Sequence, residues 1–151
     1  VYVVLLGIVW DGTLVAIENS TADRTIVDHV KELARVTGSR LLLLHVADGW
    51  AARNFEEQNL RESEEMREDR AYLGRLESEL ASEGFEVESM LAMGDPVTEI
   101  CRVANERAVD LVAMATHGHS GVSDVLHGQT VDKVRHRLSM PVLLLKARKP
   151  V

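Results

Sequence analysis

Short runs of apolar residues alternate along the chain with segments in which apolar residues recur at helical spacing. The apolar runs cover residues 13–17, 41–46, 85–93, 111–115 and 141–145. The segments with helical spacing cover residues 26–34, 54–82, 97–108 and 128–138. This alternation of strand and helix predicts a parallel sheet with helices on both faces. The run at 41–46 is apolar almost throughout, which is typical of a parallel strand covered on both sides.

Residues typical of helix termini predict where several of these helices begin and end. Gly38 follows the first helical segment, as expected for the left-handed residue that often closes a helix. The charged segment at 54–82 carries its leucines on one stripe, which predicts one amphipathic helix that ends at Gly84. Asp95 followed by Pro96 is typical of an N-cap with proline at the first helical position.

We expect the five strands to lie in the order 3-2-1-4-5 within one α/β domain of 151 residues. Right-handed crossovers leave two common orders for five parallel strands. The loops after the first and fourth strands carry the residues typical of a binding site, and in this order those two strands are neighbours. Ligands of open α/β sheets bind in the crevice where the winding reverses, beyond the carboxyl ends of the strands.

The loop after the fourth strand is rich in glycine and leads directly into the last predicted helix. Glycines let a backbone approach an anion closely, and the N–H groups at a helix N-terminus point at it. Nine residues separate Gly118 from Gly128, which matches the pattern Gly-x2-Gly-x9-Gly-Ser/Thr. Two positions depart from that pattern. Ala115 replaces its first glycine, and Gln129 replaces its final hydroxyl residue, with a hydroxyl one step later at Thr130.

This loop resembles the nucleotide-binding loop of the universal stress protein family, and the resemblance extends over residues 13–147. It implies a Rossmann-like domain of the adenine nucleotide alpha hydrolase type that binds ATP or another adenine nucleotide, with or without magnesium. It also implies a cytoplasmic, stress-linked regulator with at most slow nucleotide hydrolysis. A homodimer paired through the strand from Pro141 to Leu145 is expected, because the family forms such dimers and an open apolar edge strand invites association.

The loop after the first strand reads Ile17-Glu18-Asn19-Ser20 and is similar to the Val-Asp-Gly-Ser turn of the family. The resemblance implies that Glu18 lies beside the adenine and ribose, where a carboxylate accepts hydrogen bonds from ribose hydroxyls. Alternatively, Glu18 and Ser20 only cap the following helix, with Asp23 completing a capping box. The two interpretations are compatible.

The resemblance further implies that the backbone at the end of the second strand contacts the adenine. The expected nucleotide site comprises Ile17, Glu18, Ser20, Val46, Met114, Thr116, His117, Gly118, His119, Gly121, Gly128, Gln129 and Thr130. A rival hypothesis is a regulatory domain that has lost nucleotide binding and acts through protein contacts alone, in some proteins as an appendage of a membrane transporter. Ala115 and Gln129 favour this rival.

Charge and cysteine content narrow the function classes. A net charge of -7 without a basic stripe argues against a nucleic-acid partner. The single cysteine, Cys101, excludes an internal disulfide, and its place on an apolar helical stripe predicts a small buried hydrophobe. The sequence has no Gly-x-Ser-x-Gly elbow and no Walker lysine, so no catalytic group is assigned.

The histidines and the N-terminus carry two further expectations. His117, His119 and His127 cluster in the phosphate loop, and we expect His117 and His119 at the mouth of that site rather than a metal bound by the three. His45 ends an apolar strand, which predicts a hydrogen-bonded buried histidine. Residues 1–12 form a mainly apolar N-terminal extension, and we expect residues 1–9 to lie outside the central sheet, because both sides of the first strand are already taken. This extension docks on a partner, lies along the surface or continues an upstream membrane segment.

Overall fold

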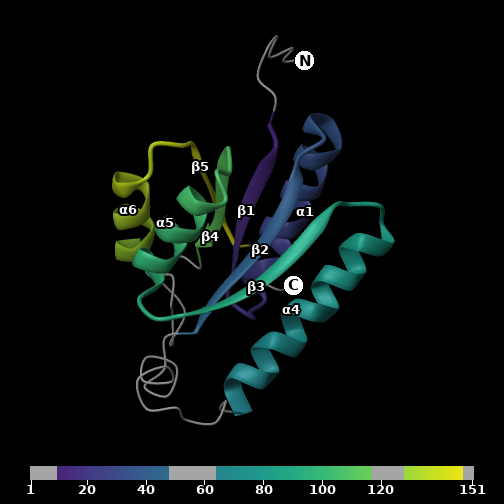
Figure 1. The fold of residues 1–151 in the computed structure, drawn as a ribbon, viewed down its shortest axis with the longest axis horizontal. Coiled ribbons are helices and arrows are strands. Elements are labelled where there is room, and N and C mark those ends of the chain that lie inside the picture. Colours follow the sequence, from purple (N-terminus) through teal and green to yellow (C-terminus); the bar gives the residue numbers. More distant parts are fainter. Residues whose placement is uncertain (1–9, 48–63, 117–127, 148–151) are drawn as a thin grey trace.

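The computed structural model describes residues 10–47, 64–116 and 128–147. Strands and helices alternate in it, as the hydrophobic pattern predicts (Figure 1). The strands are β1 (Gly12–Ile17), β2 (Arg40–Ala47), β3 (Val87–Met93), β4 (Leu111–Thr116) and β5 (Val142–Lys146). The helices are α1 (Ala22–Thr37), α4 (Glu64–Ser82), α5 (Pro96–Glu106) and α6 (Gly128–Arg137).

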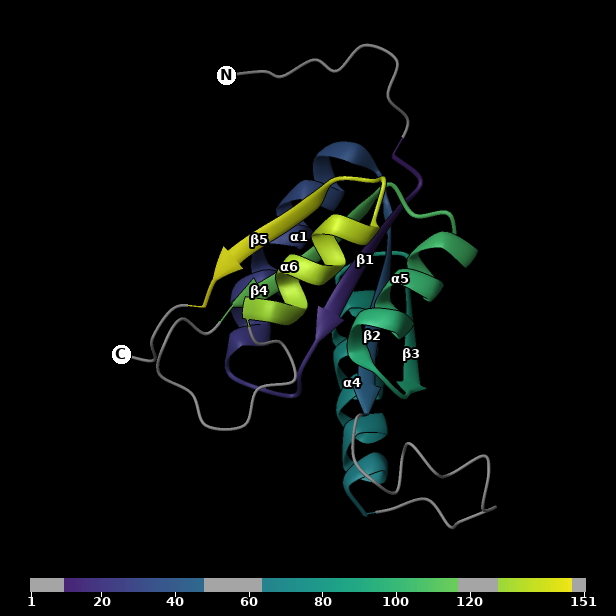
Figure 2. The same ribbon diagram turned by 90° about the vertical axis from the view of Figure 1, so that its left-hand side faces the viewer.

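The strands form one parallel sheet in the order β3-β2-β1-β4-β5, which confirms the expected fold class and strand order. Helices α1 and α4 cover one face of the sheet, and α5 and α6 cover the other (Figures 1 and 2). On β1, Leu14 and Ala16 pack with α5 and α6, whereas Val15 and Ile17 pack with α1 and α4. Because both faces are buried, the strands are apolar at successive positions rather than at every second one.

The predicted helix ends are confirmed at three positions. Gly38 has φ 73° and closes α1, with its N–H donating to the carbonyl oxygen of Ala34. Gly84, with φ 92°, follows the last turn of α4. Asp95 caps α5, because its side chain accepts a 2.9 Å hydrogen bond from the N–H of Thr98. Short-range chemistry therefore sets these boundaries.

Two strands begin later than predicted, and the other strand boundaries lie within one residue of the prediction. β3 begins at Val87 rather than at Phe85, because the N–H of Phe85 donates back to the carbonyl oxygen of Leu80 and finishes the turn after α4. β5 begins one residue after Pro141, which has no N–H to give to the sheet. The Pro141 carbonyl oxygen still accepts a hydrogen bond from the N–H of Val112, at 3.1 Å.

Two segments that carry sequence-based expectations, residues 1–9 and 54–63, lie outside the described residues. Gly12 already belongs to β1 and pairs with Arg40 of β2. Its N–H donates to a carboxylate oxygen of Asp110 at 3.0 Å, which ties the start of β1 to the start of β4. None of the helices in the described part of the chain has the length and apolar character needed to cross a membrane.

Candidate functional site

β1 and β4 separate before either strand ends. β1 pairs with β2 as far as Ile17, which lies opposite His45. Its pairing with β4 ends earlier, at Val15 opposite Ala113, although β4 continues to Thr116. The winding of the chain reverses between these two strands, so a crevice opens at the carboxyl edge of the sheet, the usual ligand position in open α/β folds.

A small hollow lies over the carboxyl ends of β1 and β2, on the face of the sheet that α5 covers. Its volume is about 220 Å³, counting its open mouth. It is lined by Ala16, Ile17, Glu18, Leu44, Val46, Pro96 and Ile100. The structure thus brings together three of the residues expected in the site, Ile17, Glu18 and Val46. Apolar walls with a single carboxylate suit a flat apolar ring that carries polar substituents.

Ser20 forms the hydrogen bonds of a helix cap. Its Oγ accepts from the N–H of Ala22 and donates to Oε2 of Glu18, both at 3.2 Å. Its N–H donates to Oδ2 of Asp23 at 3.0 Å, which is the reciprocal half of a capping box. These contacts confirm the part of the capping interpretation that concerns Ser20 and Asp23, whereas Thr21 occupies the N-cap position of α1 and its own side chain makes no cap hydrogen bond. Capping leaves the carboxylate of Glu18 at the hollow, so capping and a place for Glu18 in the site coexist.

Asp23 holds the loop after β1 together. Its side chain is buried, and its Oδ1 accepts from the N–H of Glu18 at 2.9 Å. Its Oδ2 accepts from the N–H of Ser20 and from the hydroxyl of Tyr72, each at 3.0 Å. Burial raises the pKa of the Asp23 carboxyl, and these hydrogen bonds oppose that rise. Burial, followed by the nearby Asp23 carboxylate, also raises the pKa of Tyr72.

His45 is buried on the opposite face of the sheet from the hollow, among α1 and α4. Its Nδ1 lies 2.7 Å from the carbonyl oxygen of Ile17, and its Nε2 lies 3.1 Å from Oδ2 of Asp69. The prediction of a hydrogen-bonded buried histidine is confirmed. The sequence analysis did not identify Asp69, the α4 residue that partners it.

The end of β4 places Met114 and Ala115 on opposite faces. Met114 is buried with α5 and α6, whereas Ala115 is buried in the core formed with α1 and α4. The Ala115 methyl group therefore points away from the face on which α6 begins. Thr116, partly buried, pairs with Lys146 of β5.

The family model for the universal stress protein family matches residues 12–146. The chain belongs to the universal stress protein family. Its relatives include the universal stress protein MJ0577 of Methanocaldococcus jannaschii, which is 26% identical over 80% of this chain and 85% of the relative. The solved structure of MJ0577 superimposes with a TM-score of 0.75 at 24% identity, covering 95% of this chain and all of that one.

Two further solved members of the family share the fold. A universal stress protein from Archaeoglobus fulgidus in complex with dAMP has a TM-score of 0.68 at 20% identity, with 92% of this chain and 100% of that chain covered. A family member from Arabidopsis thaliana with AMP bound has a TM-score of 0.66 at 17% identity, with 91% and 92% covered. At these identities, the likeness establishes the fold.

The phosphate loop of this family member is described only at its two ends. His117, Gly118, His119 and Gly121 of the expected site, together with His127, lie outside the described residues. Gly128 is the first residue of α6, followed by exposed Gln129 and half-buried Thr130. Figure 2 shows α6 beside α5. α6 therefore lies on the same face of the sheet as the hollow.

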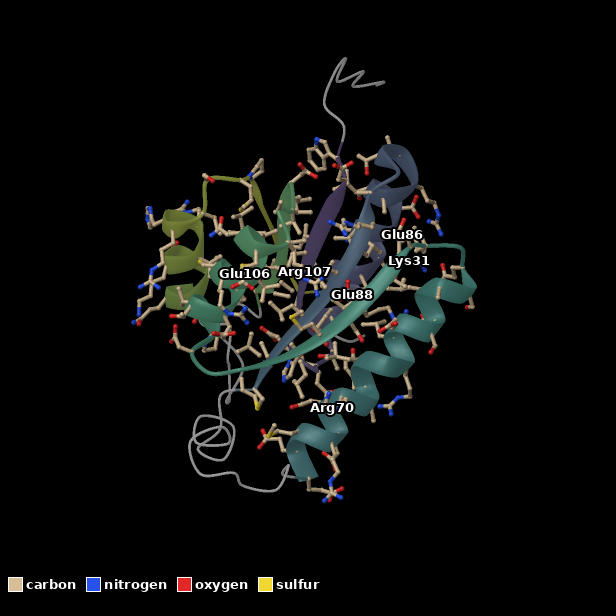
Figure 3. All side chains as sticks on the ribbon, in the orientation of Figure 1. Lys31, Arg70, Glu86, Glu88, Glu106 and Arg107 are labelled. Atoms are coloured by element: carbon tan, nitrogen blue, oxygen red, sulfur yellow. The ribbon has the colours of Figure 1, made fainter. Side chains whose placement is uncertain are left out.

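A larger hollow of about 450 Å³, which includes open solvent, lies at the opposite, amino end of the strands. Arg107 at the end of α5 and Glu88 on β3 lie side by side there (Figure 3), with a guanidinium-to-carboxylate distance of 2.8 Å. Arg40 also lines it and donates to the carbonyl oxygen of Arg107. We interpret this hollow as a surface depression lined by paired charged side chains and not as the ligand site, because open α/β sheets bind ligands at the other edge.

Cys101 lies in an environment that lowers the reactivity of its thiol. Cys101 is partly buried and packs against the core under α5, and burial raises the pKa of its thiol. A raised thiol pKa lowers the thiolate fraction and hence the reactivity of the thiol.

In the described ranges 10–47, 64–116 and 128–147, no three histidine, cysteine or carboxylate side chains gather to hold a metal.

The Asp23 carboxyl is expected to titrate above its ordinary pKa of 3.8. With the folded-state pKa raised, its contribution to stability is full below the unfolded-state pKa and is lost as pH rises through the folded-state pKa. Tyr72→Phe removes a donor that favours the charged form. It should raise the Asp23 pKa further and lower the free energy of unfolding by about 1–2 kcal/mol. Carbon-13 NMR titration of the Asp23 carboxyl tests this, and a wild-type pKa below the ordinary value contradicts it.

Proposed function

We propose that this chain is a stress-linked regulatory module that binds an adenine nucleotide, ATP or a related one, in the crevice between β1 and β4. The observation that carries the proposal is the hollow formed by Ile17, Glu18 and Val46 beside the separating strands. Structural neighbours with dAMP and with AMP support the same ligand class.

We place the adenine over the open mouth of the apolar hollow, between the ends of β1 and β2 and the start of α5. Glu18, at the end of β1, then accepts hydrogen bonds from the ribose hydroxyls. The phosphates extend toward Gly128 at the N-terminus of α6, where the backbone N–H groups of the first turn and the helix dipole favour negative charge. The remaining phosphate contacts come from the loop that contains Gly118, with or without a magnesium ion between the phosphate oxygens.

A binding role suits this site better than a catalytic one. Around the hollow the described side chains are apolar except for Glu18. A carboxylate that engages ribose hydroxyls is remote from the phosphates, where hydrolysis requires a positioned water molecule. We therefore propose that the protein binds the nucleotide as a regulatory signal in the cytoplasm and hydrolyses it at most slowly.

A homodimer paired through β5 is part of the proposal. β5 is the edge strand of the sheet next to β4, and the side chain of Leu144 is 38% exposed there. An apolar edge strand left open in water is an association hazard, which pairing with a second copy removes. The same exposed edge favours the second candidate function, in which the domain acts through protein contacts alone.

Nucleotide-free protein titrated with ATP in a calorimeter is expected to bind, and Gly118→Val is expected to weaken binding at least about tenfold, because a branched side chain prevents close approach of the backbone to the phosphates. Titrations with magnesium and with a chelator show whether the ion takes part. Folded protein that gives no heat with millimolar ATP would refute nucleotide binding and favour the protein-contact function.

Ala115→Gly restores the family residue but is not expected to change the affinity for ATP more than about twofold, because the Ala115 methyl lies in the core with α1. It should lower the free energy of unfolding by about 1–2 kcal/mol through the lost methyl and the freer backbone. Gln129→Ser, at an exposed position on α6, is the matched variant and should strengthen ATP binding. A large gain of affinity in Ala115→Gly would place its methyl in the site after all.

Leu144→Lys is expected to convert the homodimer to a monomer, because it puts a charge on the apolar edge of β5. Sedimentation velocity at tens of micromolar protein measures the change, with Val36→Lys as the control at an exposed apolar position on α1. A wild-type monomer, or a dimer that Leu144→Lys leaves intact, contradicts pairing through this strand.

A further inference from the structure

Helix α4 contacts the loop after β1 through two polar side chains. Asp69 lies on the buried stripe of α4 together with Met66 and Leu73, and it is only 6% exposed. Tyr72 follows about one turn later and is partly buried. A carboxylate on the buried stripe of a helix is costly unless other groups satisfy it, so its partners matter.

Asp69 connects α4 to the end of β2 and to the loop after β1. Its Oδ2 lies 3.1 Å from Nε2 of His45, at the end of β2. Its Oδ1 accepts a 3.0 Å hydrogen bond from the side-chain amide of Asn19, in the loop after β1. The other ring nitrogen of His45 lies 2.7 Å from the carbonyl oxygen of Ile17. One carboxylate thus links α4, β2 and the end of β1.

Each ring nitrogen of His45 has a polar partner. A carbonyl oxygen can only accept, so Nδ1 carries a hydrogen toward Ile17. Nε2 faces the carboxylate of Asp69. A buried pair of this kind is retained only while every member keeps its partner, because loss of one partner leaves a buried polar group uncompensated. Displacing α4 is therefore costly to the loop.

The loop itself is fixed on both sides of Glu18. Asn19 has φ 59°, a left-handed conformation that asparagine tolerates better than most residues, and its side chain is held by Asp69. The N–H of Glu18 is held by Asp23, which in turn accepts from the hydroxyl of Tyr72. Both anchors lead back to α4, although Glu18 itself lines the hollow on the opposite face of the sheet.

We propose that α4 regulates the affinity of the nucleotide site through the contacts that Asp69 and Tyr72 make with the loop after β1. Asp69 and Tyr72 are positioning residues that hold Glu18 toward the ribose. The inference rests on the proposed nucleotide binding. A contact that shifts α4 changes the presentation of Glu18. By linkage, a bound nucleotide stabilises the position of α4 to the same extent.

The first measurement needs no nucleotide. Asn19→Gly removes the amide that Asp69 holds, while glycine adopts φ 59° without strain. Tyr72→Phe removes only the hydroxyl, and Ser82→Ala is the control, because it removes a hydroxyl hydrogen bond from the far end of α4. Amide hydrogen exchange at the Glu18 and Ser20 positions should accelerate at least about tenfold in the first two variants and stay unchanged in the control.

The second measurement separates positioning from general loosening. Affinities for ATP and for 2′,3′-dideoxy-ATP are compared, because only ATP offers the ribose hydroxyls that Glu18 accepts. Asn19→Gly should weaken ATP binding about fivefold, the equivalent of one hydrogen bond, and dideoxy-ATP binding less than about twofold. Ser82→Ala should leave both affinities unchanged. If Asn19 has only a structural role, Asn19→Gly weakens the binding of both nucleotides equally.

Each contrary result is distinct. Unchanged exchange at Glu18 and Ser20 in both variants shows that α4 does not hold the loop. Faster exchange with an unaltered ratio of the two affinities shows that the loop does not present Glu18 to the ribose. A folded wild-type protein that binds neither nucleotide refutes the proposed function and with it this regulation, while the exchange data still report whether α4 holds the loop.

Discussion

The end of β1 has a neighbour on one side only. Pairing with β2 persists to Ile17, whereas pairing with β4 stops at Val15. Successive side chains of a strand point to opposite faces, so the residues at this end serve two environments. Ile17 is buried with α1 and α4, and Glu18 lines the hollow next to α5. The crevice, the hollow and the cap of α1 all depend on this early separation of β1 from β4.

Asp23, His45 and Asp69 are buried around this end, and each has hydrogen-bonding or ion-pair partners within the protein. Asp23 accepts three hydrogen bonds, and Asp69 has a partner for each oxygen. Such networks impose one arrangement on a loop, because any other leaves buried polar atoms unsatisfied. A loop fixed before a ligand arrives loses little conformational entropy on binding, and this favours affinity.

The strands and several helix ends could be predicted because they follow from the hydrophobic period and from residues such as Gly38 and Asp95. The strand order required a choice between two common orders, made from the residues in the loops after the first and fourth strands. The sequence was not sufficient for the partners of His45. Asp69 lies on another element, and its contact depends on how α4 packs against the sheet. The available signal was Asp69 itself, a carboxylate in line with Met66 and Leu73 on a stripe that is otherwise apolar.

The two departures from the family's phosphate-loop pattern differ in weight, and the difference comes from the geometry of β4. Ala115 follows Met114 by one residue, so its methyl group necessarily enters the core on the other face. Gln129 lies exposed at the start of α6, on the face of the hollow, so it is the substitution that a phosphate would meet. The backbone N–H groups of α6 do not depend on that side chain, and they supply most of what a helix N-terminus offers an anion. For the proposed nucleotide site, the loss of a hydroxyl at Gln129 is therefore expected to weaken phosphate contact without removing its main source.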